Sequence, residues 1–258
     1  MQTTQRKFQE TAIIIRQEEI ADNIYSMWLR TEQIAAHAAA GQFVSVYCND
    51  GSRLLPRPVS ICEIDRKDGA VRLVYRVAGK GTEEFCTMRT GNHLNVVGPL
   101  GNGFPPKERR AFLIGGGIGI PPMLQLAKEL HCEKQIVLGF RDDTFLVDEF
   151  KRYGKVYIAT EDGSAGTDGN VLDAIRENGL CADIIYACGP LPMLRALKEY
   201  AAAKHIECWI SLEERMACGI GACLACVCRS KNRDVHTNVK NKRICKEGPV
   251  FRAGEVEF

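Results

Sequence analysis

Several features that would mark a membrane-spanning, secreted or nucleic-acid-binding protein are missing from this sequence. No apolar run reaches the ~18–20 residues that a helix needs to span a bilayer. The first ten residues are polar and contain no apolar segment of the kind found in signal peptides. The net charge is only +2, so charge attracts the chain neither to nucleic acid nor to a membrane surface. We therefore expect a cytoplasmic protein with no membrane or nucleic-acid partner.

Histidine is scarce, and the sequence offers no clear acid–base site. There are five histidines, and none of the following shows a pairing with carboxylates that would indicate general acid–base chemistry: His93, His131, His205 and His236. We expect no catalytic acid or base in this chain, so its chemistry would depend on bound cofactors.

Cysteine, in contrast, is abundant, with twelve residues in a chain of 258. An even count would allow disulfides, but a chain of this length can bury a core without them. Because no export signal is visible, we expect the thiols to be reduced.

The most informative stretch contains four of these cysteines: Cys218, Cys223, Cys226 and Cys245. Their spacing is C-x4-C-x2-C followed by a distant fourth cysteine, which is the pattern of plant-type [2Fe–2S] ferredoxins. Small residues between the first two cysteines would let backbone amides approach the sulfur atoms and help to set the reduction potential. The pattern predicts a [2Fe–2S] cluster held by these four thiolates.

A structural zinc site is the main alternative for these thiols. Zinc usually takes two pairs of closely spaced ligands, whereas here three cysteines lie together and one lies apart. Cys228 lies two residues after Cys226 and is a further candidate ligand. The segment Val227–Arg229 resumes an extended pattern, however, so we expect Cys228 to be a strand residue that points away. The spacing favours iron–sulfur and leaves zinc or unliganded thiols as open alternatives.

The first hundred residues have the pattern of an antiparallel β-barrel. Short alternating or apolar runs at 11–16, 24–29, 42–47 and 71–77 indicate strands, with glycine and proline between them. One helix is expected near 81–88, and no sustained helical period occurs before Pro121. The glycine-rich segment 98–104 is expected to be a loop that closes the barrel and begins a linker.

Two motifs on this predicted barrel could contact a flavin nucleotide. The first, Arg57-Pro58-Val59-Ser60, offers an arginine for a diphosphate and a hydroxyl for a flavin ring nitrogen. The second, residues 75–82, is a strand that runs into a glycine-rich turn and a helix start, whose free amides suit a phosphate. Each motif alone is usually only a turn, and Lys80 is more simply a solvated turn lysine. The two motifs in this order are much more specific than either one.

The middle hundred residues alternate between strand-like and helix-like segments. Strands are expected at 111–114, 135–140, 156–159 and 184–187, and helices at 124–130, 147–153, 171–177 and 191–204. This alternation predicts a doubly wound parallel sheet.

Two glycine-containing turns in this region are candidate dinucleotide contacts. One holds Gly115, Gly116, Gly117 and Gly119 between a strand and a helix, which presents amides and a helix dipole to a pyrophosphate. The turn does not follow a strict G-x-G-x-x-G pattern, so it does not match the standard dinucleotide-binding fingerprint. The other is Cys188-Gly189-Pro190, at the carboxyl end of a strand, where such sheets bind ligands. The Cys188 thiol could lie against a nicotinamide ring, although a buried cysteine there is more often only packing.

The last fifty residues are expected to form a small cluster domain. A strand at 207–213 leads into the cysteine loop, the polar segment 229–242 forms a hairpin excursion before Cys245 returns, and 251–258 packs back as a final strand. The predicted domains are 1–104, a flavin-binding barrel; 105–206, a nucleotide-binding α/β domain; and 207–258, a [2Fe–2S] domain.

Taken together, these motifs resemble the ferredoxin–NADP reductase superfamily. With the cysteine set at the end, the sequence is similar more narrowly to the electron transfer subunits of NAD-dependent dihydroorotate dehydrogenase B. The resemblance covers essentially the whole chain. The positions that match the family's flavin contacts are Arg57, Pro58, Val59, Ser60, Val74, Tyr75, Arg76, Gly81 and Thr82. The segment between Cys226 and Cys245 is longer than the family pattern leads us to expect.

The resemblance implies FAD on the barrel, NAD(H) on the α/β domain and a [2Fe–2S] cluster facing a catalytic subunit that carries FMN. It also implies a heterotetramer with two subunits of each kind and a role in pyrimidine (UMP) biosynthesis. NADH gives up two electrons together as hydride, whereas the cluster accepts one at a time, so a flavin must lie between them. NAD is expected over NADP chiefly from the resemblance. Arg141 could contact an adenosine ribose or a 2′-phosphate, whereas Asp142 and Asp143 beside it disfavour the extra phosphate.

Two alternatives remain open from the sequence. One is a related NAD(P)H reductase subunit that serves a glutamate-synthase-like, hydrogenase or monooxygenase partner. The other, of a different class, is a zinc-stabilised binding module without redox activity, which would be colourless when purified.

Overall fold

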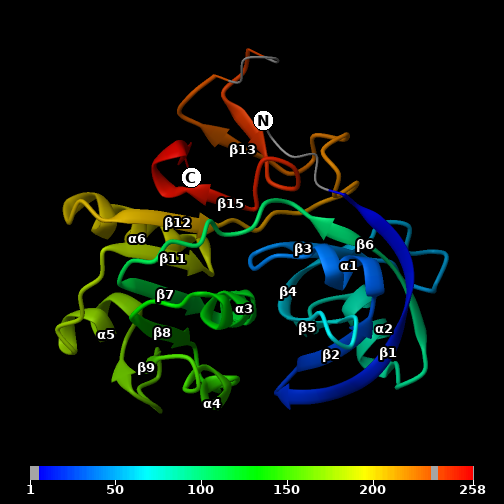
Figure 1. Ribbon diagram of the computed structural model, residues 1–258, viewed down its shortest axis with the longest axis horizontal. Helices are drawn as coiled ribbons and strands as arrows, with labels where there is room; N and C mark the ends of the chain where they lie inside the picture. The colour runs from blue at the N-terminus through cyan, green and yellow to red at the C-terminus, as the bar shows by residue number, and fades with distance from the viewer. Residues whose placement is uncertain (1–5, 234–237, 258) are drawn as a thin grey trace.

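The computed structural model describes residues 6–233 and 238–257, which form three connected regions around continuous buried cores (Figure 1). A barrel comes first, an α/β sheet second, and a small sheet with the cysteine loop lies across both. No helix in these described ranges is long and apolar enough to cross a membrane.

The first region is a closed barrel of six antiparallel strands, as the alternating pattern predicts. In order of neighbours its strands are β1 (Phe8–Ala21), β2 (Ile24–Arg30), β5 (Ala70–Arg76), β4 (Arg57–Asp65), β3 (Phe43–Val46) and β6 (His93–Leu100). Inward-facing side chains such as Val44, Val46, Leu73 and Leu94 are almost fully buried and fill the barrel. Closure gives every strand of the barrel two neighbours along at least part of its length.

Two elements of the barrel depart from expectation. The strand β6 continues through Gly98, Pro99 and Leu100, where a loop was predicted, because β6 pairs there with both β1 and β3. A short helix, α1 (Glu32–His37), precedes β3, although no helix was expected at this point. It forms because Ile34 and Ala35 pack on the barrel core. A helix of six residues is too short to show a helical period in the sequence. The expected helix near 81–88 is α2 (Lys80–Thr87).

The second region is a seven-stranded sheet with helices on both faces. Its strands in order are β10 (Thr167–Asp168), β9 (Lys155–Thr160), β8 (Lys134–Phe140), β7 (Ala111–Gly116), β11 (Ile184–Cys188), β12 (Glu207–Ser211) and β15 (Val250–Arg252). All but β15 run parallel. The helices are α3 (Pro121–Glu129), α4 (Val147–Phe150), α5 (Val171–Glu177) and α6 (Leu191–Ala203).

The two faces of this sheet bury alternate residues of each strand. Ala111 and Leu113 of β7 pack with α3 and α4, on the side that faces the barrel. Phe112 and Ile114 pack with α5 and α6 on the opposite side. A strand buried on both faces is therefore a continuous apolar run, which is why these strands were readable from the sequence.

The third region contains the cysteine loop and a three-stranded sheet of β14 (Asn241–Arg243), β13 (Val227–Ser230) and β16 (Val256–Glu257). The strands β13 and β14 pair antiparallel, as expected for the excursion between Cys226 and Cys245. Residues 234–237 of that excursion, and residue 258 of the expected final strand, lie outside the described residues. The strands β12 and β15 belong to the seven-stranded sheet, so this sheet runs across the position predicted as a domain boundary, 206/207. The division into three domains, with boundaries at 104/105 and 206/207, stays a prediction.

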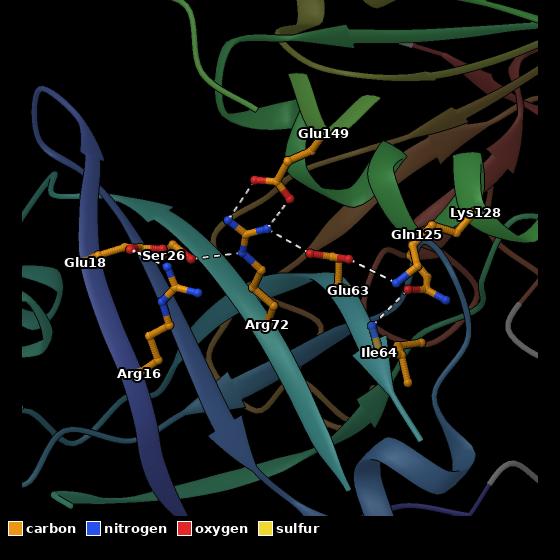
Figure 2. Close-up of polar contacts among 9 residues, drawn as sticks. All are labelled: Arg16, Glu18, Ser26, Glu63, Ile64, Arg72, Gln125, Lys128 and Glu149. Carbon is orange, nitrogen blue, oxygen red and sulfur yellow. Dashed lines mark hydrogen bonds and ion pairs between the residues drawn. The ribbon is translucent and has the colours of Figure 1, made fainter. Parts of the chain in front are cut away.

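A network of ion pairs joins the barrel to the α/β region (Figure 2). Arg72 of β5 is 5% exposed and donates two hydrogen bonds to Glu149 of α4, at 2.6 and 3.1 Å. It also donates to Glu63 and to the Ser26 hydroxyl, both within the barrel. Lys128 of α3 pairs with Glu63 at 3.0 Å. These contacts fix the orientation of the α3 and α4 face against strands β4 and β5.

Candidate functional site

The four cysteines of the predicted cluster motif come together in the third region as two pairs. In the first pair, the Cys223 amide donates a hydrogen bond to the Cys218 sulfur at 3.4 Å. The Cys245 amide also donates to the Cys226 sulfur at 3.4 Å, across the base of the β13–β14 hairpin. The long excursion therefore returns its last cysteine to the position beside the third.

Backbone amides point at the sulfur of the first pair. The amides of Ala222 and Cys223 donate to Cys218 Sγ at 3.3 and 3.4 Å. Burial acts to raise the pKa of the Cys218 thiol, but hydrogen bonds from Ile220, Cys223 and Ala222 outweigh it and lower the pKa to about 6. Cys218 is thus poised as a thiolate, the form that binds metal.

Two glycines let the loop wrap closely. Gly219 and Gly221 have φ values of +67° and +90°, in the left-handed region that residues with a Cβ disfavour. A Cβ on Gly221 would lie 2.7 Å from the Lys246 side chain, and one on Gly219 would lie 2.7 Å from Ser45 Oγ. Arg243 donates to the Gly221 carbonyl at 3.0 Å and pairs with Glu247, which anchors the loop to the segment that carries Cys245.

The arrangement fits a two-iron cluster better than one zinc ion. Two thiols at each of two positions provide two ligands for each iron of a [2Fe–2S] centre. Within residues 6–233 and 238–257, no three His, Cys, Asp or Glu side chains are gathered as they would be around a single ion. Cys228 lies on β13 opposite Lys242, two residues after Cys226, and packs partly against the core. The four-cysteine ligand set remains a prediction that this geometry supports.

The predicted flavin motifs lie where two barrel strands separate. Strands β4 and β5 stay paired only as far as Ile61 and Leu73. Beyond this point β4 continues through Ser60 to Arg57 paired with β3 alone, while β5 continues through Val74 to Arg76 paired with β2. The facing backbone edges of β4 and β5 are therefore open, which suits a planar ring that needs hydrogen bonds along its edge.

The side chains of these motifs divide between the two sides of the barrel wall. Val74 packs with the α3 side, and Arg76 is exposed. Tyr75 and Val59 pack instead with the barrel core, where Tyr75 stacks on Tyr25 with a ring distance of 6.0 Å. Residues 59 and 75 thus contribute backbone, rather than side chain, to the outer surface.

The two flavin motifs meet at the start of α2. The Arg57 side chain lies directly against Gly81, where a Cβ would be only 1.9 Å from Arg57 Nε. Thr82 accepts hydrogen bonds from the amides of Ala78 and Gly79 and so fixes the turn that begins the helix. A guanidinium beside a helix N-terminus is suited to a diphosphate.

The two predicted dinucleotide turns are also adjacent. Strands β7 and β11 are neighbours, with Gly115 opposite Cys188. A Cβ on Gly119 would lie 2.5 Å from the Cys188 backbone, and one on Gly116 would lie 3.0 Å from Pro190. Gly117 has a φ of +52° with open space beside it, and Gly189 lies against Gly116. The two turns form one surface at the carboxyl ends of the strands, with the N-terminus of α3 behind it.

Cys188 itself is fully buried. Burial raises the pKa of its thiol above the ordinary range, so it is neutral at physiological pH. Arg141, Asp142 and Asp143 follow β8 and are exposed beyond the same edge of the sheet. These positions are compatible with the predicted roles in nucleotide binding, which stay predictions.

Three residues that the sequence did not single out also shape these sites. Ser45 lies between the barrel and the cysteine loop, Arg243 anchors that loop, and Asn102 donates to the Glu247 carbonyl at 2.8 Å. Each acts through a partner more than 20 positions away. No local pattern signals such a contact.

Comparison with known proteins places the chain in a family. Residues 213–257 match the family model of the iron–sulfur cluster binding domain of dihydroorotate dehydrogenase B. The dihydroorotate dehydrogenase B (NAD(+)) electron transfer subunit of Geobacillus sp. (strain WCH70) is 46% identical, over 96% of this chain and 98% of that protein. The corresponding subunit of Fusobacterium nucleatum subsp. nucleatum is 44% identical, over 93% of this chain and 95% of that protein.

Solved structures agree with this placement. The NADH-dependent reduced ferredoxin-NADP oxidoreductase, described with insights into flavin-based electron bifurcation, superposes with a TM-score of 0.86 at 29% identity. The match covers 100% of this chain and 91% of the other. The ferredoxin reductase of carbazole 1,9a-dioxygenase shares the fold, with a TM-score of 0.65 at 19% identity over 79% of this chain and 68% of the other. The chain therefore belongs to the family of dihydroorotate dehydrogenase B electron transfer subunits.

Proposed function

We propose that this chain passes electrons between NAD(H), FAD, a [2Fe–2S] cluster and an FMN-containing dihydroorotate dehydrogenase catalytic subunit, in pyrimidine biosynthesis. The observation that carries the proposal is the position of the cysteine loop. It rests on β3, and the next strand is β4 with the flavin motif Arg57–Ser60. Neighbouring strands are ~4.8 Å apart, so the proposed flavin and cluster sites are separated by about one strand.

When bound, FAD links a two-electron hydride carrier to a one-electron cluster, and these groups supply the redox chemistry. The chain's own residues bind and orient them. Arg57 and the α2 N-terminus would hold the diphosphate, and the open edges of β4 and β5 would hold the ring. The turns at 115–119 and 188–190 would receive NAD(H), and the four cysteines would hold the cluster.

The finer assembly is part of the proposal. We expect a heterotetramer of two electron transfer and two catalytic subunits, with electrons running from dihydroorotate in the partner to NAD+. NAD is favoured over NADP because Asp142 and Asp143 would repel a 2′-phosphate. A cytoplasmic location is proposed because exposed thiols and an iron–sulfur centre suit a reducing compartment.

The test is anaerobic purification of the chain, followed by iron, sulfide and flavin analysis and a visible spectrum. We expect two irons, two sulfides and one FAD per chain, in line with one [2Fe–2S] centre, and bleaching of the spectrum on addition of NADH. Zinc in place of iron, or no bound flavin, would overturn the proposal.

A reductase subunit for another redox partner is the second candidate, because the structure with a TM-score of 0.86 belongs to a ferredoxin-NADP oxidoreductase. Co-purification separates the two. An FMN protein that oxidises dihydroorotate, bound to the chain, supports the first candidate, and any other redox partner supports the second.

A further inference from the structure

Ser45 of β3 carries a buried hydroxyl that lacks a partner. The residue is 2% exposed, and its Oγ has no hydrogen bond to any of the described residues. Burying a hydroxyl without a hydrogen bond costs roughly 1–3 kcal/mol. A partner supplied by a bound group would remove this cost.

The hydroxyl points toward the cysteine loop. Along β3, Val44 and Val46 fill the barrel, whereas Phe43 belongs to the apolar cluster outside the barrel, which also contains Cys226 and Cys245. Because side chains alternate along a strand, Ser45 shares the outer face with Phe43. Its Oγ lies 2.7 Å from the position that a Cβ on Gly219 would occupy.

The position also borders the proposed flavin site. Ser45 pairs with Pro58 of β4, inside the motif Arg57–Ser60. One side of the residue therefore adjoins the strand expected to carry the flavin, and its side chain meets the loop that begins at Cys218. Because residue 219 is glycine, the loop backbone can lie close to the hydroxyl, where a Cβ would be only 2.7 Å from Oγ.

We propose that the Ser45 hydroxyl donates a hydrogen bond to a sulfur of the [2Fe–2S] cluster and thereby raises the cluster's reduction potential. Ser45, a residue of the barrel, would in this way adjust the reduction potential of the cluster relative to that of the flavin beside it. The inference rests on the proposed function, because it requires that the cysteine loop holds the cluster.

The direction of the effect follows from charge. Reduction adds an electron to the cluster and makes its sulfur atoms stronger acceptors, so a donor stabilises the reduced form more than the oxidised form. Removal of the donor should lower the potential and leave the flavin potential unchanged.

The experiment compares Ser45→Ala with the wild type in the purified, cluster-loaded protein. Redox titration followed by electron paramagnetic resonance measures the cluster, and the visible spectrum measures the flavin. At a fixed solution potential, we expect the ratio of reduced to oxidised cluster to be about three- to tenfold lower in Ser45→Ala than in the wild type. A tenfold change in this ratio corresponds to a shift of ~59 mV in the cluster potential. Iron and sulfide content should be unchanged.

Two variants serve as controls. Thr31→Val removes another buried, unpartnered hydroxyl, next to α1 on the barrel, and should leave the potential unchanged. Ser45→Thr keeps the hydroxyl and should keep a potential close to that of the wild type. If Ser45→Ala does not load the cluster, Ser45→Cys provides a weaker donor and should give a smaller shift in the same direction.

The outcomes separate this inference from the proposed function. A wild-type protein without iron would overturn the proposed function. A loaded protein in which Ser45→Ala has the wild-type potential would overturn only the role of Ser45. An equal fall in Ser45→Thr and Ser45→Ala would assign the shift to packing and would also reject the hydrogen bond.

Discussion

Five cysteines lie in or next to the cysteine loop, and four of them form the predicted ligand set. Cys218 and Cys223 form one pair and Cys226 and Cys245 the other, while Cys228 lies on β13 opposite Lys242. A cluster ligand cannot be replaced by a hydroxyl without loss of an iron–sulfur bond, whereas a packing thiol can.

Replacement of Cys223 by serine should therefore abolish the cluster and leave FAD bound to the barrel. Iron and sulfide analysis together with flavin fluorescence measures both. The matched control is Cys228→Ser, which should keep iron and sulfide at wild-type levels. Loss of iron in the control and its retention in Cys223→Ser would exchange the roles of the two residues.

Gly119 provides a residue-level test of the nucleotide site. A Cβ there would lie 2.5 Å from the backbone of Cys188, so Gly119→Ala must push the two turns apart. We expect the KM for NADH to rise about tenfold, since ~1.4 kcal/mol of lost binding has this effect, with FAD and iron content unchanged. Gly254→Ala, at a position with open space, should match the wild type. An unchanged KM in Gly119→Ala would remove this turn from the NAD(H) site.

Sequence reasoning selected candidate residues that carry local signatures and passed over residues whose contacts span the fold. Cysteine spacing and glycine turns are local patterns, so the candidates at 218, 119 and 188 were visible. Ser45 and Arg72 looked like ordinary strand residues, because their meaning lies in partners that only the folded chain brings near. A buried arginine cannot be told from an exposed one by its neighbours in sequence.

At the scale of elements, the helices α3 and α4 are held to the barrel by the network around Arg72. Its guanidinium is buried and satisfies Glu149, Glu63 and Ser26 together. The side-chain oxygen of Gln125 on α3 also accepts a hydrogen bond from the backbone amide of Ile64 on β4. These contacts join the two regions that must present flavin and nicotinamide to each other.

Arg72→Ala should lower the free energy of unfolding by about 3 kcal/mol, because removal of one partner leaves Glu149 and Ser26 without their donor. Chemical denaturation measures this, and the rate of flavin reduction by NADH should fall as the regions lose their fixed orientation. The control is Arg16→Ala, which breaks an exposed pair with Glu18 on the same barrel (Figure 2). That change should cost no more than ~0.5 kcal/mol. Equal losses in both variants would contradict a special role for the buried network.

Element prediction succeeded where burial imposes a period and failed where pairing is decided by distant strands. The strands β7, β8 and β11 are buried on both faces and appear as apolar runs. Gly98 and Pro99 have the composition of a loop, yet β6 continues through them because it pairs with β1 on one side and β3 on the other. Likewise, the sequence near β12 contains no signal that this strand pairs with β15, which comes some forty residues later.

At the scale of the whole molecule, the cysteine loop presents apolar side chains outward. Ile220 and Leu224 lie between the predicted cluster ligands and are 47% and 57% exposed. Exposed apolar residues beside a redox centre suit a partner that must come close to it.

Ile220→Glu should therefore weaken the complex with the catalytic subunit at least tenfold, because a charge would be buried at the contact. Size-exclusion chromatography and titration of the two purified subunits measure it, with cluster content unchanged. Leu191→Glu, an exposed leucine at the start of α6, should not alter the affinity. If both variants bind the partner equally well, the contact lies elsewhere.

The return of β15 to the edge of β12 has a consequence for biosynthesis. Translation makes β12 before the four cysteines and β15 after them, so the nucleotide sheet keeps a bare edge until the last cysteine has been made. The edge of the nucleotide sheet is therefore completed only by residues that follow the cluster motif in the chain.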